Sequence, residues 1–197
     1  MFELRFKRVT ITFDFSFFAV MSLMMLFENS KYLLVCFVAC LLHESGHLIV
    51  LLLNKAKLNK VCFYGAGIKI IPDKLFDFTS DGTKFAVLIA GCLLNFITFL
   101  LLKSSSNTLL RIFALVNAGI GAFNILPLHF LDGGKILVLI IHKLCDYRRA
   151  ILLEQFVKWI NVLLIIIVII LFAVIGKENI TLYVTLCCLL FSALAYS

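Results

Sequence analysis

Six long apolar runs constrain this sequence more than any other feature. They cover residues 10–27, 31–53, 84–102, 108–128, 159–175 and 179–196, and a shorter run at 131–142 follows the fourth. A helix needs about 20 apolar residues to cross the hydrocarbon core of a bilayer. The sequence therefore predicts an all-α polytopic membrane protein with about six transmembrane helices.

The composition excludes a soluble fold. Hydrophobic residues make up 63% of the 197 residues and charged residues 15%, whereas soluble domains carry about 45–50% apolar and about 25% charged residues. A net charge of +7 would suggest a nucleic-acid partner in a soluble protein. Here the basic residues fall mostly between the spans, where they set orientation. We therefore predict that the lipid bilayer surrounds the chain and that it binds no nucleic acid.

The distribution of basic residues predicts which side each loop faces. If the N-terminus is cytoplasmic, 13 of the 18 Lys and Arg residues fall on that side, Lys135 lies in the short run at 131–142, and the outer side has Lys31, Lys103, Arg111 and Lys177. This bias follows the positive-inside rule. No small-residue cleavage site follows the first apolar run, so we expect it to remain as a span. Both termini are then cytoplasmic.

The segment 61–72, between the second and third spans, has the composition of a strand. It is rich in β-branched and aromatic residues and is interrupted by Gly65 and Gly67, which is typical of one or two short strands with a glycine kink. We expect a short membrane-associated β element here. It is either an ordinary interfacial loop or an exposed strand edge that pairs with an extended substrate.

The second span contains the motif His43-Glu44-Ser45-Gly46-His47. Positions i and i+4 share one face of a helix, so His43 and His47 can bind one metal ion. Glu44 lies beside them and can accept a proton from water, as in H-E-x-x-H metalloproteases. Charged groups at the bilayer centre cost about 2.5–3.5 kcal/mol each, and such residues usually have a function. The motif therefore predicts a zinc site.

A catalytic zinc ion needs a third protein ligand beside its open position. Asp132 is the best candidate, because Pro127 breaks the fourth span and Gly133 and Gly134 permit unusual backbone angles. Exposed backbone at membrane depth is tolerated only where it lines a cavity or is buried in protein. Helix rise counted from the outer side puts the motif and this break at a similar depth. His129 is the second candidate.

Three sequence elements together resemble the site-2 protease family of intramembrane metalloproteases, in particular the bacterial branch typified by stage IV sporulation protein FB. HESGH at 43–47 fits the family's H-E-x-x-H element, and NILPLHFLDGG at 124–134 fits its N-x-x-P-x-x-x-x-D-G element. AGCLLN at 90–95 resembles its G-P-x-x-N element, with Cys92 in place of the proline. The resemblance covers about residues 31–142.

The resemblance implies a zinc metalloendopeptidase that cleaves transmembrane or membrane-associated protein substrates. One Zn²⁺ per chain would be held by His43, His47 and Asp132, with Glu44 as the general base. The chain would lie in a bacterial cell membrane.

Further residues follow from the same resemblance and from their chemistry. Asn95 or Asn124 can donate a hydrogen bond to a developing oxyanion, although an interhelical hydrogen bond explains Asn95 equally well. Gly65 and Gly67 would mark membrane-inserted strands that contact the substrate.

We expect one membrane-embedded protease domain over residues 1–197. Its catalytic core would cover about residues 31–142, with extra helices at 10–27, 159–175 and 179–196. The alternative is a membrane zinc-binding protein or transporter, which needs no general base beside its ligands. The sequence has no obvious inverted repeat, which many transporters show.

Overall fold

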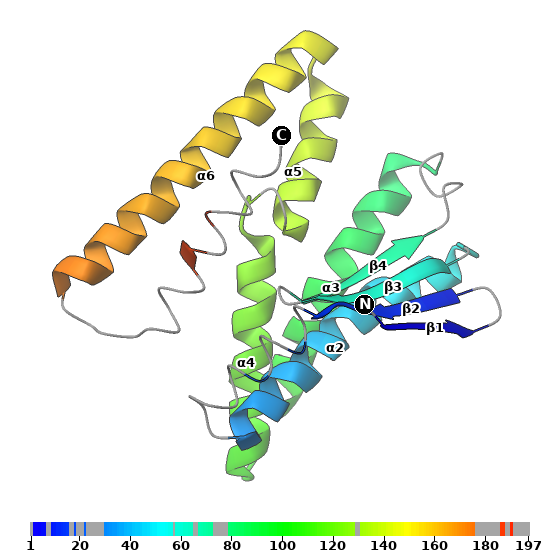
Figure 1. Cartoon of the computed structure of the whole chain (residues 1–197), viewed down its shortest axis with the longest axis vertical. Coiled ribbons are helices and arrows are strands. Elements are labelled where there is room, and N and C mark those ends of the chain that lie inside the picture. The colour runs from blue at the N-terminus through cyan, green and yellow to red at the C-terminus, as the bar shows by residue number, and fades with distance from the viewer. Residues whose placement is uncertain are drawn as a thin grey trace. The chain divides into compact units, whose positions relative to one another are not determined.

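The structure is a computed structural model that describes residues 2–6, 9–15, 18, 22, 30–56, 58–64, 67–72, 79–128, 131–175, 186–187 and 190. Its elements, in chain order, are β1 (Phe2–Phe6), β2 (Val9–Phe13), α2 (Ser30–Leu53), β3 (Leu58–Tyr64), β4 (Gly67–Pro72), α3 (Asp81–Leu102), α4 (Thr108–Ile125), α5 (Asp132–Leu144) and α6 (Tyr147–Ile175) (Figure 1). The chain divides into two compact units, residues 1–124 and 125–197.

Four of the described helices are long and apolar enough to cross a membrane: Tyr32–Leu53, Asp81–Leu102, Thr108–Ile125 and Tyr147–Ala173. They overlap four of the predicted spans, so the prediction of a mostly helical integral membrane protein is confirmed, whereas the count of six spans stays a prediction. The short run at 131–142 corresponds to α5, which is too short to span. Most of the predicted span at 179–196 lies outside the described residues.

The prediction that a helix begins at residue 10 is wrong for residues 10–13. They belong to β2, where Thr10, Ile11, Thr12 and Phe13 are β-branched or aromatic residues that favour a strand. Each pairs with both neighbouring strands of the sheet. Most of the remaining first span lies outside the described residues.

The β element is larger than the sequence predicted, because N-terminal strands join the two strands at 58–72. The sheet has four strands in the order β1-β2-β3-β4. β2 and β3 are parallel, and the other neighbours are antiparallel. Parallel neighbours need a crossover connection, usually a helix, and α2 lies between them in the chain. The helix with the histidine motif is therefore part of the crossover between two neighbouring strands of the sheet.

Helices α2 and α3 approach each other closely at a glycine. A Cβ atom on Gly46 would lie 2.5 Å from the carbonyl oxygen of Ala90, which is closer than real Cβ contacts. Small residues at helix interfaces let backbones pack together in membranes. This packing brings the backbone of α3 against the face of α2 that contains His43 and His47.

The break after the fourth span is confirmed in the second unit. Helix α4 ends at Ile125, Pro127 follows, and α5 begins at Asp132. The Asn161 side chain of α6 donates a 2.7 Å hydrogen bond to the Pro127 carbonyl oxygen. A Cβ atom on Gly133 would lie 2.0 Å from the Ile125 carbonyl oxygen, so this turn requires glycine. Both contacts stabilise the described residues on either side of the break.

Candidate metal centre

His43 and His47 lie one turn apart on α2 with their imidazoles adjacent. Their Nε2 atoms are 3.1 Å apart, the ring planes are 86° apart, and both side chains are buried. Two nitrogens that each lie about 2.0–2.1 Å from one zinc ion at a tetrahedral angle are about 3.3 Å from each other. The imidazole pair therefore fits a single ion.

The backbone of α3 fixes the protonation of His47. Its Nδ1 atom lies 2.7 Å from the carbonyl oxygen of Val87. Since a carbonyl can only accept, Nδ1 carries the proton, and the lone pair of the neutral ring is on Nε2. Metal-binding histidines almost always donate their other ring N–H in this way. Sequence reasoning missed Val87, and no signal could have indicated it, because its backbone makes the contact.

Gly91 of α3 lies directly against both imidazoles. A Cβ atom there would be 2.5 Å from His47 Nε2 and 2.8 Å from His43 Cε1. Contacts under 3.0 Å essentially never occur for real Cβ atoms. Any side chain at this position would therefore displace the ring pair. The sequence placed Gly91 only in the G-P-x-x-N-like element.

Glu44 completes a cluster of three donor side chains on α2. One carboxylate oxygen and one nitrogen from each of His43 and His47 all lie within 4.8 Å of one another. Glu44 is half-buried between the buried histidines. The structure thus brings the three predicted motif residues together, and a carboxylate at this position can exchange a proton with water near the imidazoles.

The two predicted asparagines differ in their surroundings. Asn95 on α3 is fully buried, and neither polar atom of its side chain has a hydrogen-bond partner among the described residues. Asn124, in the last turn of α4, donates through Nδ2 to the Ile120 carbonyl oxygen at 3.0 Å. The amide of Asn95 is therefore the one with unused hydrogen-bonding capacity.

The remaining predicted site residues lie in the second unit, in the sheet or outside the described residues. Asp132 is the first residue of α5, and its Oδ1 atom is 3.1 Å from the Lys135 ammonium. A carboxylate in the first turn of a helix is favoured by the helix dipole. Gly67 begins β4, whereas Gly65 and His129 lie outside the described residues. The role of Asp132 as a third ligand stays a prediction.

Comparison with known proteins indicates one class of protein, the membrane metalloproteases. The family described as Peptidase family M50 matches residues 99–171, a stretch that includes the break at 124–134 but not the histidine motif. A zinc metalloprotease of Methanocaldococcus jannaschii is 30% identical over 126 residues, which are 59% of this chain and 36% of that protein. The chain thus spans only about a third of the length of this relative.

A solved structure covers nearly the whole chain. The site-2 protease from Methanocaldococcus jannaschii matches with a TM-score of 0.70 and 24% identity, over 98% of this chain and 93% of that one. The fold and the buried histidine pair thus define an integral membrane protein with the site-2 protease fold. The comparisons confirm the resemblance to the site-2 protease family that the motifs predicted.

Proposed function

We propose that this chain is an intramembrane zinc metalloprotease that hydrolyses peptide bonds of transmembrane or membrane-associated proteins. The observation that carries the proposal is the buried pair of imidazoles, whose Nε2 atoms are 3.1 Å apart. Glu44 lies beside them on a helix that is able to span a membrane. The site-2 protease fold and the relative named as a zinc metalloprotease support it.

His43 and His47 would hold one zinc ion through their Nε2 atoms, and Asp132 would be the third ligand. Zinc, when bound, acts as a Lewis acid that polarises the scissile carbonyl and makes water more acidic. The Val87 carbonyl keeps the lone pair of His47 on Nε2. Gly91 leaves room for both rings. The protein thus contributes a preformed pair of ligands before any metal arrives.

Glu44 would act as the general base and then as the general acid. Its carboxylate accepts a proton from the attacking water and returns it to the leaving amine. Asn95 is the better oxyanion donor of the two asparagines, because the amide of Asn124 already donates to Ile120. A buried amide without partners is costly, and a developing oxyanion would satisfy it.

We propose that an extended substrate segment adds to the sheet at β4. This strand is at the edge of the described sheet, where it pairs only with β3, and an edge strand can bind an added strand through its backbone. A substrate held this way cannot remain helical, so its peptide bonds become accessible. Gly67 is the first residue of β4, and Gly65 precedes it by two positions in the sequence.

Valine at both Gly65 and Gly67 is expected to slow cleavage several-fold without changing zinc content, because β-branched side chains at the start of β4 would restrict the backbone and hinder an added strand. Valine at Gly82, whose Cβ would lie 3.9 Å from the nearest side-chain atom, serves as the control. Cleavage and zinc should be measured on the same preparations. Unchanged cleavage in the double variant would contradict a role of this edge.

We further propose a single membrane-embedded protease domain with its core at about residues 31–142. It would have six spans in a bacterial cell membrane, with both termini cytoplasmic. The placement of 13 of 18 Lys and Arg residues on one side supports this orientation.

Metal removal tests the proposal directly. Purified protein is expected to bind one zinc ion per chain, and a chelator should abolish cleavage of a single-span substrate until zinc is restored. His43→Ala and His47→Ala should each lose zinc, whereas His142→Ala should keep it, because His142 pairs with Glu154 on the surface of the second unit. Protein without stoichiometric zinc would overturn the proposal. Zinc binding without cleavage would favour the zinc-binding or transport alternative.

A further inference from the structure

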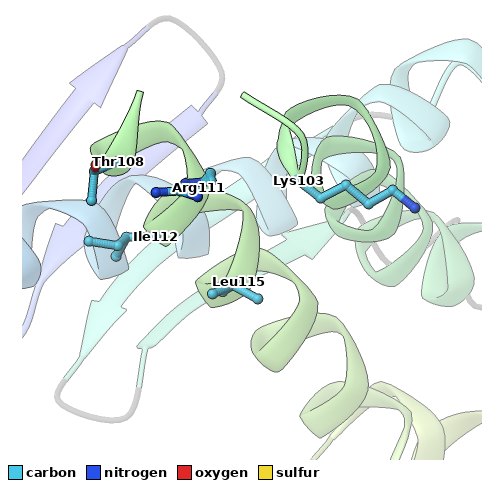
Figure 2. A pocket seen from close by; sticks show the side chains of 5 residues that line it. All are labelled: Lys103, Thr108, Arg111, Ile112 and Leu115. Carbon is cyan, nitrogen blue, oxygen red and sulfur yellow. The ribbon is translucent and has the colours of Figure 1, made fainter. Parts of the chain in front are cut away.

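A cavity of about 270 Å³ lies beside the turn between α3 and α4, within the first unit. Figure 2 shows its five lining side chains: Lys103 just after α3, and Thr108, Arg111, Ile112 and Leu115 from the start of α4. The four α4 residues occupy positions i, i+3, i+4 and i+7, so they lie on one face of the helix. This face changes from polar to apolar as α4 enters the membrane.

The two cations of this cavity form no ion pair with a carboxylate among the residues that the structure describes. The sequence contains no Asp or Glu from residue 82 to residue 131, so neither helix has an acid near the cavity. No described carboxylate forms an ion pair with Lys103 or Arg111. The Lys103 ammonium lies 5.9 Å from the ring centroid of Phe99, a contact that attracts the charge without neutralising it. Both residues are exposed, so an anion from outside the described part of the chain can pair with them.

The depth of the cavity shows where that anion would be. Lys103 follows the last residue of a membrane-spanning helix, and Arg111 lies three residues, about 4.5 Å, inside the next one. Basic side chains near helix ends extend toward the interface. We therefore expect the two charges at the level of the lipid headgroups. Leu115, with an exposed fraction of 64%, lies one helix turn further along α4, where we expect the acyl chains.

We propose that this cavity binds an anionic phospholipid of the adjacent leaflet. The headgroup phosphate would contact Arg111 and accept a hydrogen bond from the Thr108 hydroxyl, and an acyl chain would lie along Ile112 and Leu115. The long Lys103 side chain, whose ammonium points away from α4 in Figure 2, would turn toward the phosphate. The order of groups on α4, a hydroxyl and a cation followed by two aliphatic side chains, matches the order of groups along a phospholipid. The site is separate from the histidine motif and does not depend on the proposed proteolysis.

Native mass spectrometry of full-length protein released from vesicles of phosphatidylglycerol or of phosphatidylcholine tests this proposal. The wild type is expected to retain one phosphatidylglycerol and no phosphatidylcholine. Lys103→Gln with Arg111→Gln should weaken retention by roughly 30-fold, since each cation near an anionic surface changes affinity by about fivefold. The control, Lys143→Gln with Arg149→Gln, removes the same charge at the exposed turn between α5 and α6 and should retain the lipid.

Two further measurements distinguish a specific lipid site from general electrostatic attraction between the protein and anionic lipid. Ile112→Trp keeps both cations but fills the cavity, so it should also release phosphatidylglycerol. Millimolar inorganic phosphate should not displace the lipid, because it makes no acyl contacts. Three results would each overturn the proposal. They are equal lipid retention by Ile112→Trp and the wild type, equal loss of lipid from both double charge variants, and displacement of the lipid by phosphate alone. Glu44→Gln protein should bind the lipid normally, whatever its proteolytic activity.

Discussion

Glu44→Gln is expected to lower the rate of substrate cleavage by at least about 100-fold, because positioned general bases contribute about 10²–10⁴-fold. Glutamine has nearly the same shape as glutamate but cannot accept the proton from water. The imidazole nitrogens that would bind zinc belong to His43 and His47, so the zinc content should stay the same. Single-turnover cleavage of a reconstituted single-span substrate and metal analysis of the same sample would measure both quantities.

The neighbouring Ser45→Ala variant is the matched control for this experiment. Ser45 lies on the same helix turn, but its hydroxyl donates to the Leu41 carbonyl oxygen of its own helix at 2.7 Å, so it should cleave like the wild type. Cleavage by Glu44→Gln at the wild-type rate would rule out a general-base role. Loss of zinc from Glu44→Gln would instead make Glu44 a ligand, and the third-ligand role of Asp132 would then fall.

The membrane helices could be predicted from the sequence because each is a continuous apolar run. The predicted spans 31–53 and 84–102 agree with α2 and α3 to within three residues at either end. Hydropathy identifies such helices because the bilayer requires their length and their apolar surface. Hydropathy does not identify polar first turns, such as those of α6 before residue 159.

The sheet could not be predicted in full, for two physical reasons. A five-residue strand such as β2 directly precedes a longer apolar stretch, and hydrophobicity alone does not separate the two. Its partner β3 lies more than 40 residues away in the chain, so no local pattern records their pairing. Only the strands at 58–72, which are interrupted by glycine and lie outside any span, had a recognisable pattern.

The candidate site was predictable where it is local and unpredictable where it depends on packing. His43, Glu44 and His47 are held together by the geometry of one helix, which the spacing in the sequence reveals. Val87 contributes only a carbonyl oxygen, and Gly91 contributes only the absence of a side chain. Neither contribution can be recognised from the type of residue in the sequence. Both become apparent only when α3 is packed against α2.

Gly91→Ala is therefore the variant that tests the packing of the metal centre, and it is expected to lose zinc and most of its activity. The new methyl group would lie 2.5 Å from His47 Nε2, so the rings, the helices or both must move. Overpacking of this kind costs about 1–3 kcal/mol. A displacement of about 1 Å at a catalytic site can lower activity by about 100-fold.

Gly119→Ala is the control for adding a methyl group to a membrane helix, because its Cβ would have no atom within 4 Å. It should match the wild type in zinc content, cleavage rate and thermal unfolding. If Gly91→Ala also kept full zinc and activity, α3 would not hold the imidazoles, and the tautomer assigned to His47 through Val87 would lose its structural basis. If Gly91→Ala lost zinc while its unfolding temperature fell by only a few degrees, the defect would be local to the ring pair. That second result is the one we expect, because the three atoms nearest to the added methyl group all belong to the rings of His43 and His47.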